Sequence, residues 1–422
     1  MELQSFQQLA TQLFADIRSL TFDGVGVTRA SYGEGENKAA QYLEDFAVKE
    51  GLAVHRDRAG NLVFSDPEDA RAQPAVWVGS HIDSVPQGGN YDGLAGVVAG
   101  LLVQVAAKRE QKNFPVPLKV VVFRGEESAW FGKAYMGSGA LWGKLTAADL
   151  ELQRRGDHKT MRECMLACGA DVEAIARQEK LLNPRDIRAY VELHIEQGPV
   201  MVARNIPLGV VSGIRGNVRH NVIGCVGEAQ HSGVVPRWLR HDAVFAISDL
   251  IMRLDTHWRA LLERGTDLVV TCGVMQTNPQ EHSISRVPGY ASFSLEARSK
   301  SIDTLEAFYQ LVQAEMRSIE RERGVQFQPD RRLLSDPAVT DAQLSQLLAQ
   351  ACTARGIAHE SIPSGAGHDA ALFANHGVPS AMLFVRNQNG SHNPHEAMEM
   401  DDFMLGVQVL ADMLESLDAP KA

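Results

Sequence analysis

The sequence predicts an α/β protein: a main domain with a mixed, mostly parallel sheet flanked by helices, plus an inserted α+β domain. Three observations predict this fold. A strand, a helix and a second strand follow one another between residues 75 and 124. Strand-like segments recur at 187–195 and 378–386, so one sheet draws on distant parts of the chain. Between them, from about residue 213, the pattern changes to alternating strands and long amphipathic helices.

The first strand–helix–strand unit is predicted from its composition. AVWVGS (75–80) is short and apolar, and VPLKVVVFR (116–124) is rich in β-branched residues. The longer segment between them, GLAGVVAGLLVQVAAKREQ (93–111), consists mainly of helix formers. IRAYVELHI (187–195) and VPSAMLFVR (378–386) are expected to add two further strands to the same sheet.

The inserted domain is predicted from a change in periodicity. VRHNVIGCVGEA (218–229) and YASFSLEARS (290–299) alternate apolar and polar residues, which predicts strands with one buried face. Two long amphipathic segments, 242–263 and 302–323, predict helices that cover that face. The expected division is a main domain of two segments, 1–212 and 333–422, and an inserted domain of residues 213–332.

The composition is typical of a folded protein that acts on small molecules. The 422 residues exceed what one hydrophobic core usually serves, so two domains are expected. The formal charge is -11, whereas a surface for nucleic acid or anionic membrane needs an excess of Lys and Arg. No run approaches eighteen apolar residues, so no membrane span is expected. We therefore expect a small-molecule substrate, no nucleic acid and no membrane partner.

The cysteines and the N-terminus favour the cytoplasm. The first twenty residues have helical spacing and lack the uninterrupted apolar core of a signal peptide. An odd number of scattered cysteines suits reduced thiols. These are Cys164, Cys168, Cys225, Cys272 and Cys352. Cys164 and Cys168 can share a helix face, but no second Cys or His pair accompanies them, so helix packing is favoured over a structural zinc site.

The first candidate site segment is GSHIDSVPQGGNYDGLAG (79–96), which places His81, Asp83, Asp92 and five glycines after a strand. His81 and Asp83 are two residues apart, so on an extended chain their side chains project from the same face. If His81 binds a metal ion, Asp83 can hold its second ring nitrogen and fix its tautomer. Taken alone, the pair also fits a histidine with ordinary surface partners.

Four further acidic or imidazole side chains lie where predicted strands end. Glu126 and Glu127 follow the second strand, and adjacent carboxylates repel each other unless a cation lies nearby. A solvated loop is the alternative interpretation of that pair. His194 ends the third predicted strand, and His392 lies in the polar loop after the fourth. In open α/β sheets, active sites form at the carboxyl ends of the strands.

Together these segments predict a two-metal site. His81, Asp92, Glu127, His194 and His392 supply nitrogen and oxygen ligands and no thiolate, which suits zinc, with manganese or cobalt as substitutes. Five ligands for two divalent ions require one carboxylate to bridge them. Positions then stay open for water and substrate, as catalytic sites require.

With GSHIDSVPQGGNYDG, ELHIEQGP, SGAGHDA and GSHNPHE in this order, the chain resembles the zinc-dependent hydantoinase/carbamoylase family of amidohydrolases. That family includes N-carbamoyl-L-amino acid hydrolase, β-ureidopropionase and allantoate amidohydrolase, and is related to dimetal carboxypeptidases and aminoacylases. The resemblance extends over nearly the whole chain. It implies that Asp92 bridges two metal ions, with His81 and His194 at one ion and Glu127 and His392 at the other.

The resemblance also implies roles for residues outside the ligand set. Glu126 would take a proton from the bridging water and pass it to the leaving nitrogen, while Asp83 orients His81. His231 matches a histidine that stabilises the developing oxyanion in a neighbouring subunit's site. Arg298 matches an arginine that pairs with the substrate carboxylate. From the residues alone, these two would be a loop histidine and a surface arginine. The inserted domain that carries them would serve as a lid and dimer interface.

Other matches and departures concern the substrate. Gln197, His368 and Asp369 match positions that contact the substrate or support the site. Ser285 stands where many members have an asparagine that contacts the substrate carboxylate. Residues near the strand ends that differ from the family pattern, and could reshape the pocket, are Trp130, Arg386 and Asn387.

The predicted function is hydrolysis of the C–N bond of an N-carbamoyl (ureido) group on a small amino-acid-like carboxylate, by a cytoplasmic homodimer. A deacylase or dipeptidase that uses the same metal ions is the second hypothesis. The third is a ligand-binding homologue without activity, against which the complete ligand set and Glu126 argue.

Overall fold

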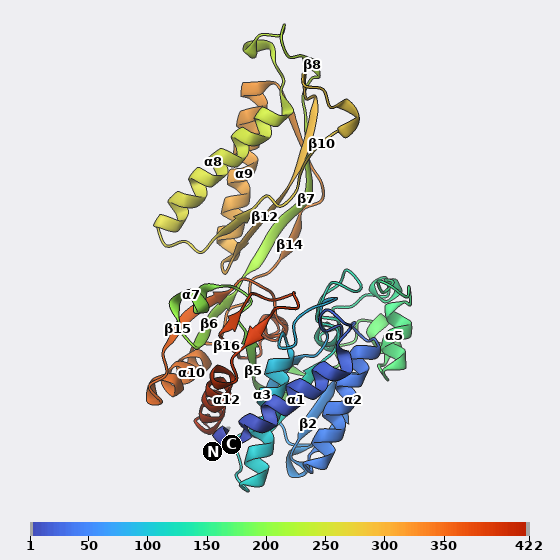
Figure 1. The fold of residues 1–422 in the computed structure, drawn as a ribbon, viewed down its shortest axis with the longest axis vertical. Helices are drawn as coiled ribbons and strands as arrows, with labels where there is room; N and C mark the ends of the chain where they lie inside the picture. The colour runs from blue at the N-terminus through green and yellow to red at the C-terminus, as the bar shows by residue number, and fades with distance from the viewer. Residues whose placement is uncertain (1–2, 419–422) are drawn as a thin grey trace. The chain divides into compact units, whose positions relative to one another are not determined.

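A computed structural model describes residues 3–418 of the chain. The chain divides into two compact units: Met1–Gly213 with Val339–Ala422 form unit 1, and Ile214–Ala338 form unit 2. Both units are mixtures of helices and strands (Figure 1). The predicted fold class, a mixed sheet flanked by helices and a second domain with an antiparallel sheet, is confirmed.

Unit 1 is built on an eight-stranded sheet with the order β1-β2-β4-β3-β5-β16-β6-β15. The four central strands are parallel, because β3 pairs parallel with β4 and β5, and β5 pairs parallel with β16. β1, β2 and β6 are antiparallel to their neighbours. The strands are β1 (Ala53–Arg56), β2 (Leu62–Ser65), β3 (Ala75–His81), β4 (Leu118–Phe123), β5 (Ile187–Ile195), β6 (Leu208–Ile214), β15 (His359–Ser364) and β16 (Ser380–Val385).

Helices cover both faces of the central strands, which explains why these strands are mostly apolar. All residues of β3, β4 and β16 are buried. On one face α3 packs against β3, β4 and β5. Successive residues of a strand point to opposite faces of the sheet, and Trp77 of β3 points to the face opposite α3. There Phe373 of α11 contacts Trp77 and Tyr190, with ring centroids 6.2 and 4.4 Å apart.

The α-helices of unit 1 are mostly amphipathic, but α3 is buried from Leu94 to Ala107. It lies between the sheet and α12, which also packs against β16. The helices are α1 (Gln7–Thr21), α2 (Glu34–Lys49), α3 (Leu94–Arg109), α4 (Met136–Leu141), α5 (Met161–Ala167), α6 (Val172–Ala176), α7 (Val200–Arg204), α10 (Ala342–Ala354), α11 (Asp369–Asn375) and α12 (Met400–Glu415). None of the helices formed by residues 3–418 is long and apolar enough to cross a membrane.

Unit 2 is an antiparallel sheet with two long helices packed against it. β7 pairs with β12 along most of its length, and α8 and α9 lie side by side against both strands (Figure 1). The buried face includes Ile223, Phe293, Leu250 and Phe308. The elements are β7 (Gly216–Val226), β8 (Gln230–His231), α8 (Ala243–Glu263), β9 (Val269–Thr271), β10 (Met275–Thr277), β11 (Arg286–Val287), β12 (Tyr290–Ser299), α9 (Ile302–Arg323), β13 (Gln326–Pro329) and β14 (Leu333–Ser335).

Candidate metal centre

The ends of the four parallel strands bring the predicted site residues together. His81 is the last residue of β3, and the loop after β4 carries Glu126 and Glu127. His194 is the penultimate residue of β5. His392 lies after β16, in the loop between two short paired strands, β17 (Asn387–Gln388) and β18 (Ala397–Met398). Because these strands are parallel neighbours, their carboxyl ends lie at one edge of the sheet.

Asp92, which lies just before α3, is the centre of the cluster. Its Oδ1 lies 3.5 Å from Nε2 of His81 and 3.2 Å from Nε2 of His194. Its Oδ2 lies 3.4 Å from Nε2 of His392, which is in turn 3.3 Å from Oε1 of Glu127. Two groups that could hold a cation therefore share Asp92, each on a different carboxylate oxygen.

The donor set fits two divalent cations. Ligands arranged tetrahedrally about 2.05 Å from zinc lie about 3.3 Å from one another. The nitrogen–oxygen separations around Asp92 lie between 3.2 and 3.5 Å. His81, Asp92 and His194 are buried, whereas the His392 side chain is half exposed, with 50% of its surface accessible. Imidazole and carboxylate donors without thiolate are those that zinc and manganese accept in catalytic sites.

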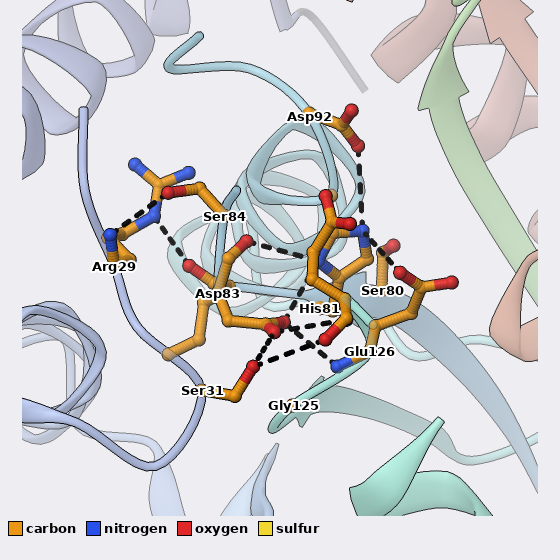
Figure 2. A network of polar contacts seen from close by, with 12 residues as sticks. Arg29, Ser31, Ser80, His81, Asp83, Ser84, Asp92, Gly125 and Glu126 are labelled. Carbon is orange, nitrogen blue, oxygen red and sulfur yellow. Dashed lines mark hydrogen bonds and ion pairs between the residues drawn. The ribbon is translucent and has the colours of Figure 1, made fainter. Parts of the chain in front are cut away.

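Asp83 links His81 to the turn that bears the two glutamates (Figure 2). Its Oδ1 is 3.2 Å from Nδ1 of His81, the ring nitrogen that faces away from Asp92. The same carboxylate accepts hydrogen bonds from the backbone N–H groups of Glu126 and Glu127, at 2.9 and 3.0 Å, and from the Ser31 hydroxyl at 2.6 Å. Asp83 is fully buried, so it fixes these groups relative to one another.

Glu126 lies beside the cluster without belonging to either cation group. Its Oε2 is 3.9 Å from Nε2 of His81, and its side chain is 12% exposed. Figure 2 shows Glu126 and Asp92 both facing the His81 ring. Burial raises the pKa of Glu126 well above its ordinary value, and the charges of Glu127 and Asp369 add to this against the opposing His81. A carboxylate in this position can accept a proton beside the candidate ligands without belonging to either ligand group.

The electrostatics of the cluster favour positive charge around Asp92. Burial would raise the pKa of Asp92, but hydrogen bonds with His194, His392 and His81 hold that pKa well below its ordinary value. Hydrogen bonds to Asp92 and Glu127 raise the pKa of His392 to about 11. Burial would lower the pKa of His81 and of His194, yet neighbouring carboxylates outweigh it and raise both. These positions are therefore suited to divalent cations.

A third group that could hold a cation adjoins the first, and sequence reasoning missed part of it. It consists of Glu192, His194 and His368. The Glu192 carboxylate accepts the Ser80 hydroxyl at 2.6 Å and the Ala370 N–H at 3.0 Å, so both its oxygens are occupied. The signal for Glu192 was its place two residues before His194, on the same face of a buried strand.

Three residues outside the predicted ligand set hydrogen-bond to Asp92: Gln197, Ser391 and Glu396. The last two were not predicted from the sequence. Nε2 of Gln197 donates to Oδ2 of Asp92 at 2.8 Å and lies 3.3 Å from Nε2 of His392. The Ser391 hydroxyl donates to Asp92, and its oxygen lies 2.8 Å from Oε2 of Glu396. Glu396 also accepts the Asp92 N–H at 3.2 Å. Such partners orient a ligating carboxylate.

Two residues of the GAGHDA segment, His368 and Asp369, lie next to the cluster. His368 is buried, its ring centroid 4.5 Å from that of His194, and its Nε2 contacts the Ser364 hydroxyl at 2.8 Å. The Ser138 hydroxyl donates to Asp369, which is buried as well. The structure therefore brings both near the candidate metal centre, on the side of β5.

The residues that differ from the family pattern have structural partners in unit 1. Nε1 of Trp130 donates to the Ser84 carbonyl at 2.7 Å. Arg386 pairs with Asp402 at 2.7 Å and donates to Asn205 at 2.6 Å. The Asn387 amide donates to the Gly390 carbonyl at 2.9 Å, which shapes the loop between β17 and β18 that leads to the candidate ligand His392.

The three predicted site residues of unit 2 fall into two places. His231 is exposed on β8, opposite Arg286 of β11, and the carbonyl of Ser285 accepts the Ser232 N–H at 2.8 Å. β11 is followed directly by β12, and Arg298 lies near the C-terminal end of β12. There its Nε and Nη2 pair with Glu296 at 2.9 and 3.1 Å. From Tyr290 to Arg298 the strand spans roughly 26 Å. His231 and Ser285 are thus neighbours, and Arg298 is remote from both within one chain.

Gly93 brings the backbone against the His81 ring. Its φ is +67°, and a Cβ at this position would lie 2.5 Å from three atoms of that ring. Its N–H also points at Nε2 of His194, 3.3 Å away. The motif contains several glycines, and only the fold reveals that this one leaves room for a candidate ligand.

Gly93→Ala is expected to weaken metal binding by about 10–100-fold, because the added methyl group displaces His81. The measurement is a competitive chelator titration of the purified protein. Gly132→Ala is the matched control, since Gly132 has a φ of +70° and a Cβ there would meet nothing within 4 Å, so it reports backbone strain alone. Equal affinity in both variants and in the natural protein would contradict the close approach.

Comparisons with known proteins show the family and the fold of the chain. The model of peptidase family M20/M25/M40 matches residues 77–416. The chain is 31% identical over 391 residues to N-carbamoyl-L-amino-acid amidohydrolase from Pseudomonas sp. (strain NS671), with 92% of each chain covered. It is 32% identical over 395 residues to allantoate amidohydrolase from Escherichia coli (strain K12), with 93% of each covered. A hydantoinase/carbamoylase family amidase from Burkholderia multivorans has a similar structure, with a TM-score of 0.88, 26% identity and coverage of 99% of this chain and 98% of that one.

Proposed function

This chain belongs to peptidase family M20/M25/M40, and we propose that it is a two-metal amidohydrolase that cleaves the C–N bond of an N-carbamoyl (ureido) group on a small amino-acid-like carboxylate. As a member of this family it is a hydrolytic amidase. The ureido substrate is inferred from relatives named N-carbamoyl-L-amino-acid amidohydrolase and allantoate amidohydrolase.

The observation that carries the proposal is the position of Asp92 between two groups of candidate ligands. One oxygen faces His81 and His194, and the other faces His392 with Glu127 beside it. This supports a bridging carboxylate between two divalent ions. Zinc suits the donors best, with manganese or cobalt as substitutes. When bound, the ions polarise the ureido carbonyl and lower the pKa of water.

In this proposal, side chains of the protein transfer the protons and hold the reacting groups in position. Glu126 accepts a proton from the attacking water and delivers it to the nitrogen that leaves. Asp83 holds His81 and the turn of Glu126 in one geometry. Water adds to the ureido carbon and one of its C–N bonds breaks, which leaves a carbamate; the carbamate then loses carbon dioxide, so that ammonia, carbon dioxide and the free amino acid are released.

Two side chains suit recognition of the substrate. Oε1 of Gln197 is buried and has no hydrogen-bond partner among residues 3–418, so it can accept an N–H of the ureido group. The substrate carboxylate would replace Glu296 at the guanidinium of Arg298, a planar donor that binds carboxylates in a bidentate manner.

We also propose a cytoplasmic homodimer in which His231 serves the site of the partner subunit. The support is the separation of His231 and Arg298 along unit 2, because one small substrate cannot contact both within a single chain. His231 would stabilise the developing oxyanion there, and Ser285 lies beside it. The five free cysteines suit a reducing compartment.

Mixing two inactive variants tests the exchange of His231. In a mixed dimer of Glu126→Gln and His231→Ala chains, one site carries both defects and the other carries neither, if His231 acts on the partner. An equal mixture, unfolded and refolded together, should regain about one quarter of the natural activity. If the mixture stays as inactive as its components while size measurements show a dimer, His231 acts within its own chain.

The substrate class is tested with matched derivatives of one amino acid. The N-carbamoyl form should release ammonia at least about tenfold faster than the N-formyl and N-acetyl forms release their acids. Ureidopropionate and allantoate complete the panel, and a carbamoyl amine without a carboxylate reports the contribution of Arg298. Preference for the N-acetyl form or a dipeptide would assign a deacylase or dipeptidase instead.

A further inference from the structure

A buried ion pair adjoins the turn that carries Glu126. Oε2 of Glu36, on α2, is 2.7 Å from Nη2 of Arg124, the first residue after β4, and the two side chains are 0% and 1% exposed. The same oxygen accepts the Tyr32 N–H at 2.6 Å. Burial raises the pKa of the Glu36 carboxyl, although Arg124 opposes this. Because desolvation opposes such pairs, they are poor sources of stability and better suited to fixing a geometry.

The second oxygen of Glu36 reaches the turn itself. Oε1 accepts the Gly125 N–H at 2.8 Å. The next two N–H groups, of Glu126 and Glu127, donate to Asp83 at 2.9 and 3.0 Å. Three consecutive N–H groups of the turn are therefore held by two buried carboxylates.

The other edge of the turn is held by backbone. The carbonyls of Arg124, Gly125 and Glu126 accept N–H groups at 2.9, 2.8 and 2.9 Å; the donors are Gly137, Met136 and Tyr135. Both edges of the segment are thus hydrogen-bonded, and its position depends on the residues that accept and donate these hydrogen bonds.

The space around Gly125 shows how closely this support fits. Gly125 has a φ of +64°, and a Cβ there would lie 2.8 Å from the Tyr32 ring and 2.9 Å from Cε of Met136. The Arg124 guanidinium lies over the same Tyr32 ring, 5.2 Å from its centroid. Tyr32, Glu36, Arg124 and Gly125 therefore form one packed unit against the turn.

We propose that Glu36 is a positioning residue for Glu126 in the reaction proposed above, and the inference rests on that function. Asp83 cannot be tested separately from the metal centre, because it also contacts His81. The hydrogen bonds and the ion pair of Glu36 go to Tyr32, Gly125 and Arg124, so this carboxylate acts on the turn without touching a candidate ligand. A displacement of about 1 Å of a catalytic group can cost about 100-fold in rate.

The test compares three variants with the natural protein. Glu36→Gln removes the carboxylate but leaves Arg124 buried without its charge partner. Glu36→Gln with Arg124→Met removes both charges, so folding is not burdened by an unpaired cation. Glu34→Gln is the matched control, because Glu34 lies on the same helix and pairs with Lys38 in an exposed position. The readouts are kcat, KM, bound metal and hydrogen exchange of the peptide that contains residues 124–127.

We expect the double variant to fold, to keep its metal ions and its KM, and to lose about 100-fold in kcat. Its 124–127 peptide should exchange at least about tenfold faster, and Glu34→Gln should match the natural protein. A double variant with natural kcat and natural exchange would overturn the proposal, as would a loss of kcat that only follows loss of metal. An inactive natural protein would instead refute the proposed function, and the exchange measurement would still report whether Glu36 holds the turn.

Discussion

Glu126→Gln is expected to lower kcat by about 10²–10⁴-fold while both metal ions stay bound. The amide has the shape of the carboxylate but cannot accept the proton of the attacking water. Glu126 is not among the groups of described residues that could hold a cation, and its Oε2 lies 3.9 Å from Nε2 of the candidate ligand His81. Stopped assays of ammonia release and metal analysis of the same sample measure the two quantities.

Glu68→Gln, an exposed substitution in unit 1, serves as the control for the change of charge. It should leave both quantities unchanged. Natural turnover in Glu126→Gln would remove the assigned base. Loss of metal together with turnover would mean that Glu126 is a ligand or holds a ligand in place.

Asp92→Asn is expected to abolish turnover and to reduce the metal content below two ions per chain. The substitution converts one oxygen of the shared carboxylate to a donor, so one of the two groups loses its common ligand and the centre loses a negative charge. When the metal ions no longer polarise the substrate carbonyl, the activation barrier rises by several kcal/mol. The rate then falls on the order of a thousandfold. Metal analysis after dialysis and a substrate assay with added metal check this.

Asp45→Asn is the matched control, because Asp45 is exposed on α2 and its carboxylate accepts a hydrogen bond from Gln41 of the same helix. If Asp92→Asn kept two tightly bound ions and ordinary turnover, a bridging role for Asp92 would be wrong. Recovery of activity at high metal concentration would show instead that the site is weakened rather than lost.

The sequence contained enough information for the fold class and family, both of which are confirmed. β5 and α9 were located well because each has a long, uniform pattern: nine residues with eight buried in β5, and a regular apolar stripe in α9. The outer strands β1, β2, β6 and β15 were not predicted. They are four to seven residues long, and β2, β6 and β15 each pair with a strand far away in the chain.

For the site, the sequence could locate the strand ends but not the geometry between them. That Asp92 presents one oxygen to each group follows only from the fold. Glu36, Gly93, Ser391 and Glu396 were missed for a common reason: each supports another residue, and nothing in a single sequence distinguishes a buried supporting residue from an exposed one. The roles of the ligands, of Glu126 and of the unit 2 residues stay predictions.

The central claim, a two-metal amidohydrolase for ureido substrates, is tested most directly by counting metal ions and products in one preparation. The chain is loaded with zinc, freed of excess metal and assayed with an N-carbamoyl amino acid. We predict two ions per chain, with ammonia and the free amino acid released in equal amounts and all activity lost on chelation. Full turnover with one ion or none, or two bound ions without turnover of any ureido compound in the panel, would contradict the claim.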